Sequence, residues 1–341
     1  MPSAYGHQHN GPTAAGRDHG RTRHLPAPPR ATLSVVTVRS IEPASDQRTT
    51  ARRVAVFVLL AYALAWLVCL PLWLSGRGLE TPGAGLLLIV MMYAPGVAAL
   101  ITRTIVPDGT RPVDALLLRP GSPRRWWLPA LIGWIGIPIA AAAAMFLAIA
   151  LGFMKPDFAH LSGFAAVLRS RGAAEAISRA GLPLGALVAI QVLSILPGAF
   201  INMLAAIGEE TGWRGFLQPV LTRVGGRWVG IVGTGIIWGL WHTPILLLGY
   251  NFPALNPGLR LLWMVVACII LSAIFGHLVD RAGTVWVSAL AHGTLNASAG
   301  LPVLFVAAGS TFNAALVSMI GVAGWIVNIV FYLILRLVRK P

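Results

Sequence analysis

The chain has 341 residues, of which 56% are hydrophobic and only 11% are charged, and its mean hydropathy is +0.74. A water-soluble protein of this length does not normally have such a composition, so we expect an integral membrane protein. Lys and Arg number 26 against 11 acidic residues, but they concentrate in the N-terminal segment and in alternate loops. This placement fits membrane topology and argues against a nucleic-acid partner. Cys69 and Cys268 lie in apolar segments without a partner at metal-ligand spacing, and we expect both to be buried.

Residues 1–53 are rich in Gly, Pro, Ala, Arg and His and have no long apolar run. They are expected to form a disordered cytoplasmic tail. The histidines of this segment are irregularly spaced, so a solvated tail is favoured over a metal site; they are His7, His9, His19 and His24.

Apolar stretches long enough to cross a bilayer of about 30 Å follow the tail. We therefore predict an all-α polytopic protein with eight transmembrane helices, at 54–75, 84–105, 126–153, 183–208, 228–249, 260–279, 284–300 and 314–335. The positive-inside rule places both termini in the cytoplasm, and the expected location is the plasma membrane of a prokaryote. Loop 154–182 is basic although it falls on the outer side, so either it contains a short interfacial helix or the number of spans is wrong by two.

The spans divide into an N-terminal group over 54–182, a core over 183–300 and a C-terminal helix with a basic tail over 301–341. Pro197-Gly198 interrupts the fourth span, so the following helix either continues from 183 or restarts near 198 and runs to about Leu221. The fifth span has small-xxx-small glycine spacings, which would let a neighbouring backbone approach closely; they are Gly226, Gly230, Gly235 and Gly239.

Three charged residues stand beside the apolar core in the run A-A-I-G-E-E-T-G-W-R. An ionisable side chain at the centre of a membrane helix costs roughly 2.5–3.5 kcal/mol, so Glu209, Glu210 and Arg214 are expected to have a function. Glu210 and Arg214 are four residues apart on one helical face and can form an ion pair. Glu209 points about 100° away around the helix and is left free to act as a general base.

Two further spans carry polar side chains that we expect to turn inward. His242 follows Trp238 by four residues, and His292 precedes Asn296 by four, so each pair shares a helical face. Histidine can polarise a water, bind a metal or donate to an oxyanion, and Asn296 supplies a second donor. His277 lies at the cytoplasmic end of its span and is interpreted as a packing residue. Together the carboxylates, histidines and Asn296 predict a hydrolytic site.

The ordered motifs E-E-x-x-x-R, aromatic-x-x-x-His and His-x-x-x-Asn resemble the CPBP intramembrane protease family. This family includes the type II CAAX prenyl proteases and the Abi bacteriocin-immunity proteins, and the resemblance covers roughly residues 183–300. It implies that Glu209 and His242 activate water and that His292 and Asn296 stabilise the oxyanion, with Glu210 and Arg214 in support. The family usually has phenylalanine where this chain has Trp238.

Metal use is left open by these residues. The family name suggests a metalloprotease, and Glu209, His242 and His292 would give the three protein ligands of a catalytic Zn²⁺. The pattern is not H-E-x-x-H, and a metal-free glutamate mechanism fits the same residues.

We therefore expect an intramembrane endopeptidase that acts on a membrane-associated, in one version lipidated, peptide or protein. The alternatives are a proton-coupled transporter, which uses the same groups as a relay, and an inactive immunity or scaffold protein of the same family. A bis-histidine haem site from His242 and His292 is a further alternative. The sequence does not choose between lipidated C-terminal peptides and other membrane-bound peptides.

Overall fold

A computed structural model describes residues 44–173, 179 and 181–337, and the regular structure of these residues is helical. The predicted all-α class is therefore confirmed. Most of the expected tail, with its four histidines, lies outside the described residues. The first helix, α1, begins at Ala44, ten residues before the predicted first span.

The helices of 13 or more residues are α1 (Ala44–Leu74), α6 (Ile137–Ala150), α10 (Ile195–Gly212), α12 (Arg227–Trp241), α14 (Pro257–Ala282), α15 (Trp286–Ser298) and α17 (Val322–Leu337). The shorter helices are α2 (Ala84–Met92), α3 (Ala94–Ile105), α4 (Pro112–Ala115), α5 (Pro123–Leu131), α7 (Ser162–Ser170), α9 (Leu184–Leu193), α11 (Gln218–Gly225), α13 (Thr243–Leu246) and α16 (Ala314–Val317). Turns of 3₁₀-helix lie at Gly78–Glu80 and Leu301–Leu304, and π-helical turns at Ile132–Gly136 and Trp213–Leu217.

Within the described residues, five helical stretches are long and apolar enough to cross a membrane. They are Gln47–Leu74, Ala84–Ile105, Pro123–Ala150, Pro257–Ala282 and Ala314–Leu337. A sixth is formed if α9 and the helical path from Ile195 to Gly225, which bend by 48° at their junction, count as one span. The structure thus supports a polytopic membrane protein, but with five or six candidate spans instead of the predicted eight.

The difference in span number comes from α12 and α15. These helices have 15 and 13 residues, which correspond to about 20 Å of helical rise, less than the roughly 30 Å of a hydrocarbon core. Most side chains of α15 are buried within the protein. A helix enclosed by other helices does not need to match the thickness of the lipid, and this accounts for α15. The apolar run 228–249 overstated the length of α12 because it also contains the separate short helix α13.

The helical path is interrupted at Ser194, between α9 and α10. The helix that carries the two glutamates therefore restarts at Ile195, and it continues through a π-helical turn into α11. Of the two versions predicted for this segment, the restart is confirmed. Loop 154–182 contains the short helix α7, as one of its two interpretations expected.

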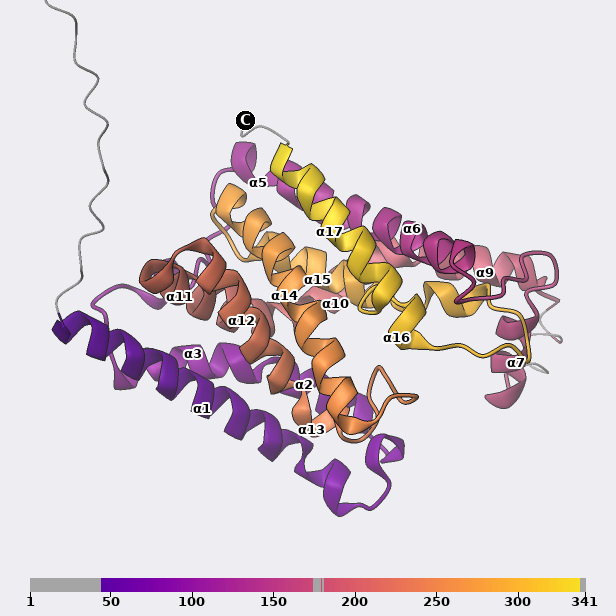
Figure 1. Ribbon diagram of the computed structural model, residues 1–341, viewed down its shortest axis with the longest axis horizontal. Coiled ribbons are helices and arrows are strands. Elements are labelled where there is room, and N and C mark those ends of the chain that lie inside the picture. Colours follow the sequence, from indigo (N-terminus) through magenta and orange to yellow (C-terminus); the bar gives the residue numbers. More distant parts are fainter. Residues whose placement is uncertain (1–43, 174–178, 180, 338–341) are drawn as a thin grey trace, which may run out of the picture. The chain divides into compact units, whose positions relative to one another are not determined.

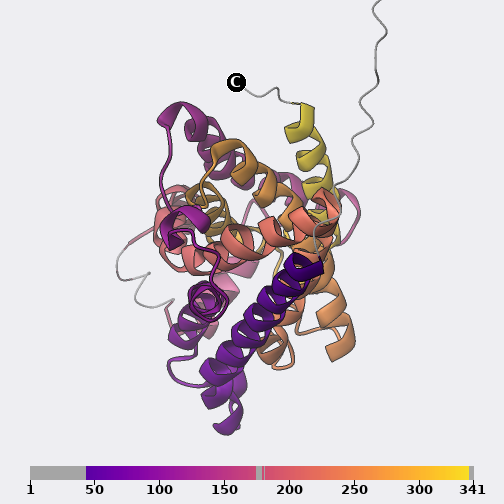
Figure 2. The ribbon, with the colours of Figure 1, turned by 90° about the vertical axis from the view of Figure 1, so that its left-hand side faces the viewer.

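Helix α14 packs between α12 and α17 and also contacts α15 (Figure 1). Helix α1 runs along the outside of the helical unit, where Leu59, Leu67 and Leu74 are exposed (Figure 2). The glycine spacing on α12 has the predicted effect, because a Cβ at Gly239 would overlap the backbone of Val265 on α14.

Helices α10 and α15, which carry the glutamates and His292, are in backbone contact. A Cβ at Gly293 of α15 would overlap the backbone of Ala199 and Met203 on α10. Because glycine has no Cβ, the two helices can touch at this point, and the neighbouring His292 can reach the carboxylates of α10.

Candidate active site

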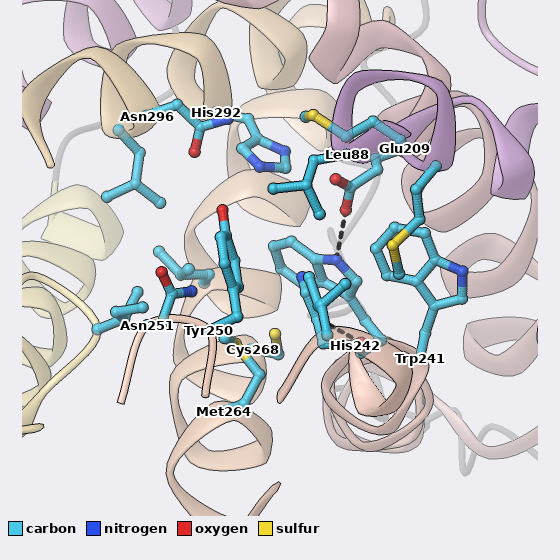
Figure 3. A pocket seen from close by; sticks show the side chains of 17 residues that line it. Leu88, Glu209, Trp241, His242, Tyr250, Asn251, Met264, Cys268, His292 and Asn296 are labelled. Atoms are coloured by element: carbon cyan, nitrogen blue, oxygen red, sulfur yellow. Dashed lines mark hydrogen bonds between the residues drawn. The ribbon is translucent and has the colours of Figure 1, made fainter. Parts of the chain in front are cut away.

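Four of the six predicted site residues line one cavity of about 110 Å³, although they come from three helices (Figure 3). They are Glu209, His242, His292 and Asn296. A single water needs only roughly 10–15 Å³ of such space, so the cavity has room for several waters. The expectation that these distant residues converge on one pocket is therefore met by the geometry.

Glu209 is 3% exposed and directs Oε2 at two tryptophans. The indole Nε1–H of Trp238 donates to this oxygen at 2.6 Å, and that of Trp213 donates to it at 3.3 Å. Oε1 receives neither indole bond. In the sequence Trp238 is the aromatic residue of the aromatic-x-x-x-His motif, and its hydrogen bond to Glu209 is a finding of the structure.

Glu210 lies behind Glu209 and is fully buried. Its Oε1 accepts hydrogen bonds from Arg214 Nη1 and from His292 Nδ1, both at 2.9 Å. The predicted pair between Glu210 and Arg214 is thus present. Neither residue lines the cavity. They can therefore affect the cavity only through His292, whose ring is held by Glu210, while Arg214 holds Glu210.

The guanidinium of Arg214 is sandwiched as well as paired. It lies 4.2 Å from the ring centroid of Trp238 and 5.0 Å from that of Phe275, and its Nη2 donates to Ser272 Oγ at 3.4 Å. Arg214 belongs to the π-helical turn Trp213–Leu217, which begins at the end of α10, three residues after Glu210. Cation–π contacts of this kind favour arginine over lysine, because the planar guanidinium can stack on both rings.

His242 stands at the C-terminal end of α12, where its Nδ1 lies 2.9 Å from the carbonyl oxygen of Trp238. A carbonyl oxygen only accepts, so Nδ1 carries the proton and Nε2 keeps its lone pair. His242 is half-buried and lines the cavity, and it therefore offers an acceptor to a bound water. Asn296 is exposed and lines the cavity, and among the described residues its side-chain amide has no hydrogen-bond partner, so it can bind a ligand.

Residues 191–298 match the family of Rce1-like type II CAAX prenyl endopeptidases. This segment of the chain is a domain of that family. A search of curated proteins finds no match to the chain. The Rce1-like domain includes α10, α12 and α15, so all six predicted site residues lie inside it.

The three groups expected to bind Zn²⁺ belong to the Rce1-like domain but are not grouped as metal ligands. Among the described residues, no three His, Cys, Asp or Glu side chains stand close enough together to hold a metal ion. In this arrangement Oε2 of Glu209 is hydrogen-bonded to the indoles of Trp213 and Trp238, and Nδ1 of His292 is hydrogen-bonded to Glu210. The residues as arranged do not fit a three-ligand zinc site.

The other histidine of the domain, His277, stands apart from the cavity. Its Nδ1 is 3.4 Å from Arg227 Nη2, and its ring contacts Tyr332 edge-on. These contacts agree with its interpretation as a packing residue.

Sequence reasoning missed two cavity residues, Tyr250 and Asn251. Both belong to the loop between α13 and α14, and neither stands at helical spacing from a predicted site residue. The only signal available was a polar pair in the uncharged run G-Y-N-F-P.

Proposed function

We propose that the protein is an intramembrane endopeptidase that hydrolyses a peptide bond of a membrane-associated peptide or protein. The observation that carries this proposal is the shared cavity of Glu209, His242, His292 and Asn296, with the ion pair of Glu210 and Arg214 behind it. Membership of the Rce1-like domain in a protease family supports the same reaction class.

The apolar part of the cavity supports a hydrophobic substrate segment. Much of the wall is formed by aliphatic and thioether side chains, among them Leu88, Met91, Met264, Leu271, Leu295 and Ile320. Such a wall favours uncharged side chains next to the scissile bond, because burying an unpaired charge there would cost several kcal/mol.

In the proposed mechanism, Glu209 removes a proton from water as the water oxygen attacks the scissile carbonyl carbon. Because both indoles bind Oε2, Oε1 is the oxygen left to receive this proton. His242 orients the same water through the lone pair of Nε2. Collapse of the tetrahedral intermediate breaks the C–N bond, and the proton held by Glu209 passes to the leaving amine.

His292 and Asn296 are proposed to hold the oxyanion. The amide of Asn296 donates directly. His292 already donates from Nδ1 to Glu210, so it can donate from Nε2 only as an imidazolium ion. The buried carboxylate of Glu210 neutralises that positive charge, and this gives Glu210 a role in catalysis without contact with the substrate.

Replacing Glu209 by Gln tests the proposal, since it keeps the shape of the side chain but removes the base. We expect cleavage of an internally quenched, farnesylated C-terminal peptide by the purified protein to fall at least about 10²-fold, with unchanged thermal stability. Glu80→Gln is the matched control, because Glu80 is exposed in a turn distant in sequence from Glu209, and this variant should cleave normally.

Cleavage by Glu209→Gln at the wild-type rate would refute the assignment of the base. Uptake of a solute into liposomes driven by a pH gradient, without cleavage by the wild-type protein, would instead support a proton-coupled transporter. Absence of both activities, with a correctly folded protein, would favour the inactive family member.

A further inference from the structure

The loop between α13 and α14 brings a tyrosine into the cavity from the wall opposite α15. Tyr250 and Asn251 line the cavity, and both are half-buried. In Figure 3 the ring of Tyr250 rises from this loop, and its hydroxyl points to the side of the cavity where His292 and Asn296 lie. None of the roles described above uses this hydroxyl.

The phenol of Tyr250 differs from the other tyrosines of the described residues. Tyr62 donates to the carbonyl of Ile237, Tyr93 donates to that of Leu204, and the hydroxyl of Tyr332 receives hydrogen bonds from two arginines. Tyr250 has no hydrogen-bond partner among the described residues. A half-buried tyrosine normally finds a partner for its hydroxyl, so a cavity-facing phenol without one points to a ligand.

The hydroxyl of Tyr250 remains a donor over the working pH range. Burial, and next the negative charge of Glu209, raise the pKa of Tyr250 above its usual value of 10. The phenol therefore keeps its proton at neutral pH, where it can donate a hydrogen bond in the same pocket as the carboxylate of Glu209.

Arg260 of α14 fixes the loop that carries Tyr250. Arg260 donates to the carbonyl oxygens of Phe252, Leu246, Leu247 and Pro253, at 3.1 to 3.3 Å. Phe252 is 1% exposed and anchors the loop next to Tyr250. Asn251 has φ of 59°, a left-handed conformation that asparagine accepts more readily than most residues. These contacts make the loop a fixed wall of the cavity, as a preorganised hydrogen-bond donor requires.

We propose that Tyr250 is a further catalytic residue, whose hydroxyl donates a hydrogen bond to the scissile carbonyl oxygen alongside His292 and Asn296. The hydrogen bond strengthens as negative charge develops on that oxygen, and the tyrosine keeps its proton throughout. This inference rests on the proposed peptidase function and adds a donor from outside the motifs that the sequence displays.

Tyr250→Phe removes the hydroxyl and keeps the ring. We expect kcat for the farnesylated, internally quenched peptide to fall about 10²-fold, as when one donor of an oxyanion hole is removed, with KM raised only several-fold. Tyr62→Phe, which removes a hydroxyl that bonds to a backbone carbonyl away from the cavity, is the matched control and should keep the wild-type kcat. An unchanged kcat in Tyr250→Phe would overturn the inference while leaving the peptidase function intact.

A binding measurement makes the test independent of turnover. In the Glu209→Gln background, Tyr250→Phe should weaken binding of the uncleaved peptide several-fold. It should not weaken binding of an analogue whose scissile C=O is replaced by CH₂, because that analogue has no carbonyl to accept. Equal weakening for both peptides would assign Tyr250 to packing and overturn the inference. If Tyr250→Phe weakens binding only of the peptide with the carbonyl, and the wild-type protein does not cleave it, the hydrogen bond from Tyr250 to the carbonyl is upheld and only the proposed function is overturned.

Discussion

Glu209 and Glu210 are neighbours in the chain but have opposite surroundings. Glu209 faces the cavity and is bound by neutral indole donors, whereas Glu210 faces inward and is bound by cationic or ionisable donors. Neutral donors stabilise a carboxylate without neutralising its charge, which suits a base that must still accept a proton. The full charge of Arg214 on Glu210 suits a group that must stay ionised. The roles proposed for the two carboxylates thus follow from the sides of α10 on which they lie.

Arg214 gives the first prediction at this scale. It is 1% exposed and pairs with a carboxylate that is itself fully buried, so Arg214→Gln removes a permanent cation from Glu210 and leaves the carboxylate bonded to His292. We expect the free energy of unfolding in detergent to fall by about 3–5 kcal/mol. Arg119→Gln removes a comparable pair with Asp114, but this pair is largely exposed and should change stability by about 1 kcal/mol or less. Equal effects for the two variants, measured by denaturant titration, would contradict the buried character of the Glu210 pair.

At the scale of the helices, charged residues hold the end of α3 and the loop that follows it, away from the cavity. Arg103 donates from Nη1 to Asp108 Oδ2 at 2.6 Å and from Nη2 to Oδ1 at 2.7 Å, and Thr110 also donates to Oδ1. Arg53 of α1 donates to the carbonyl oxygens of Val106 and Pro107 in the same loop. The end of α3 is therefore held against α1 mainly by hydrogen bonds and charge.

This junction predicts a pH dependence of stability. Burial would raise the pKa of Asp108, but the hydrogen bonds from Arg103 and Thr110 outweigh it and lower the pKa from 3.8 to about 2. A lowered folded-state pKa contributes stability above the unfolded value, and this contribution is lost as the pH falls from about 4 to about 2. We expect Asp108→Asn to melt below the wild-type protein at pH 7, and the difference to close over that window. A difference in melting temperature that stays constant down to pH 2 would contradict this role.

At the scale of the whole molecule, the sequence predicted the helical class and, as one of two versions, the restart of the α10 helix. It also proposed six site residues, four of which line one cavity. The Glu210–Arg214 pair followed from helical spacing, and the spacing also placed His292 and Asn296 on one face. It did not predict the hydrogen bond from Trp238 to Glu209, because indole donors carry no periodic signal. Tyr250 was missed because its loop is positioned by Arg260 through backbone carbonyls, which have no sequence signature.

The number of spans was also beyond the sequence, since hydropathy does not distinguish a helix that faces lipid from one enclosed by protein. The loops nevertheless meet as the predicted topology requires. On the predicted outer side, Asp157 N–H donates to the carbonyl of Phe305, and Ala307 N–H to that of Lys155. On the predicted inner side, Trp286 Nε1 donates to the carbonyl of Leu118. The two outer hydrogen bonds join loops that the positive-inside rule assigns to the same face, and the inner one joins a loop to the first residue of α15, near the inner end of the predicted span 284–300.

This agreement leads to a prediction for the orientation of the chain in the membrane. Cys69 and Cys268 are buried and should not react, so a cysteine added to an exposed loop reports its own side. In intact cells, we expect a membrane-impermeant maleimide to label Ala308→Cys, in the outer loop, and not Ser122→Cys, in the inner loop. Permeabilised cells should label both, and the unmodified protein should remain unlabelled in each case. Labelling of Ser122→Cys alone in intact cells would invert the predicted topology.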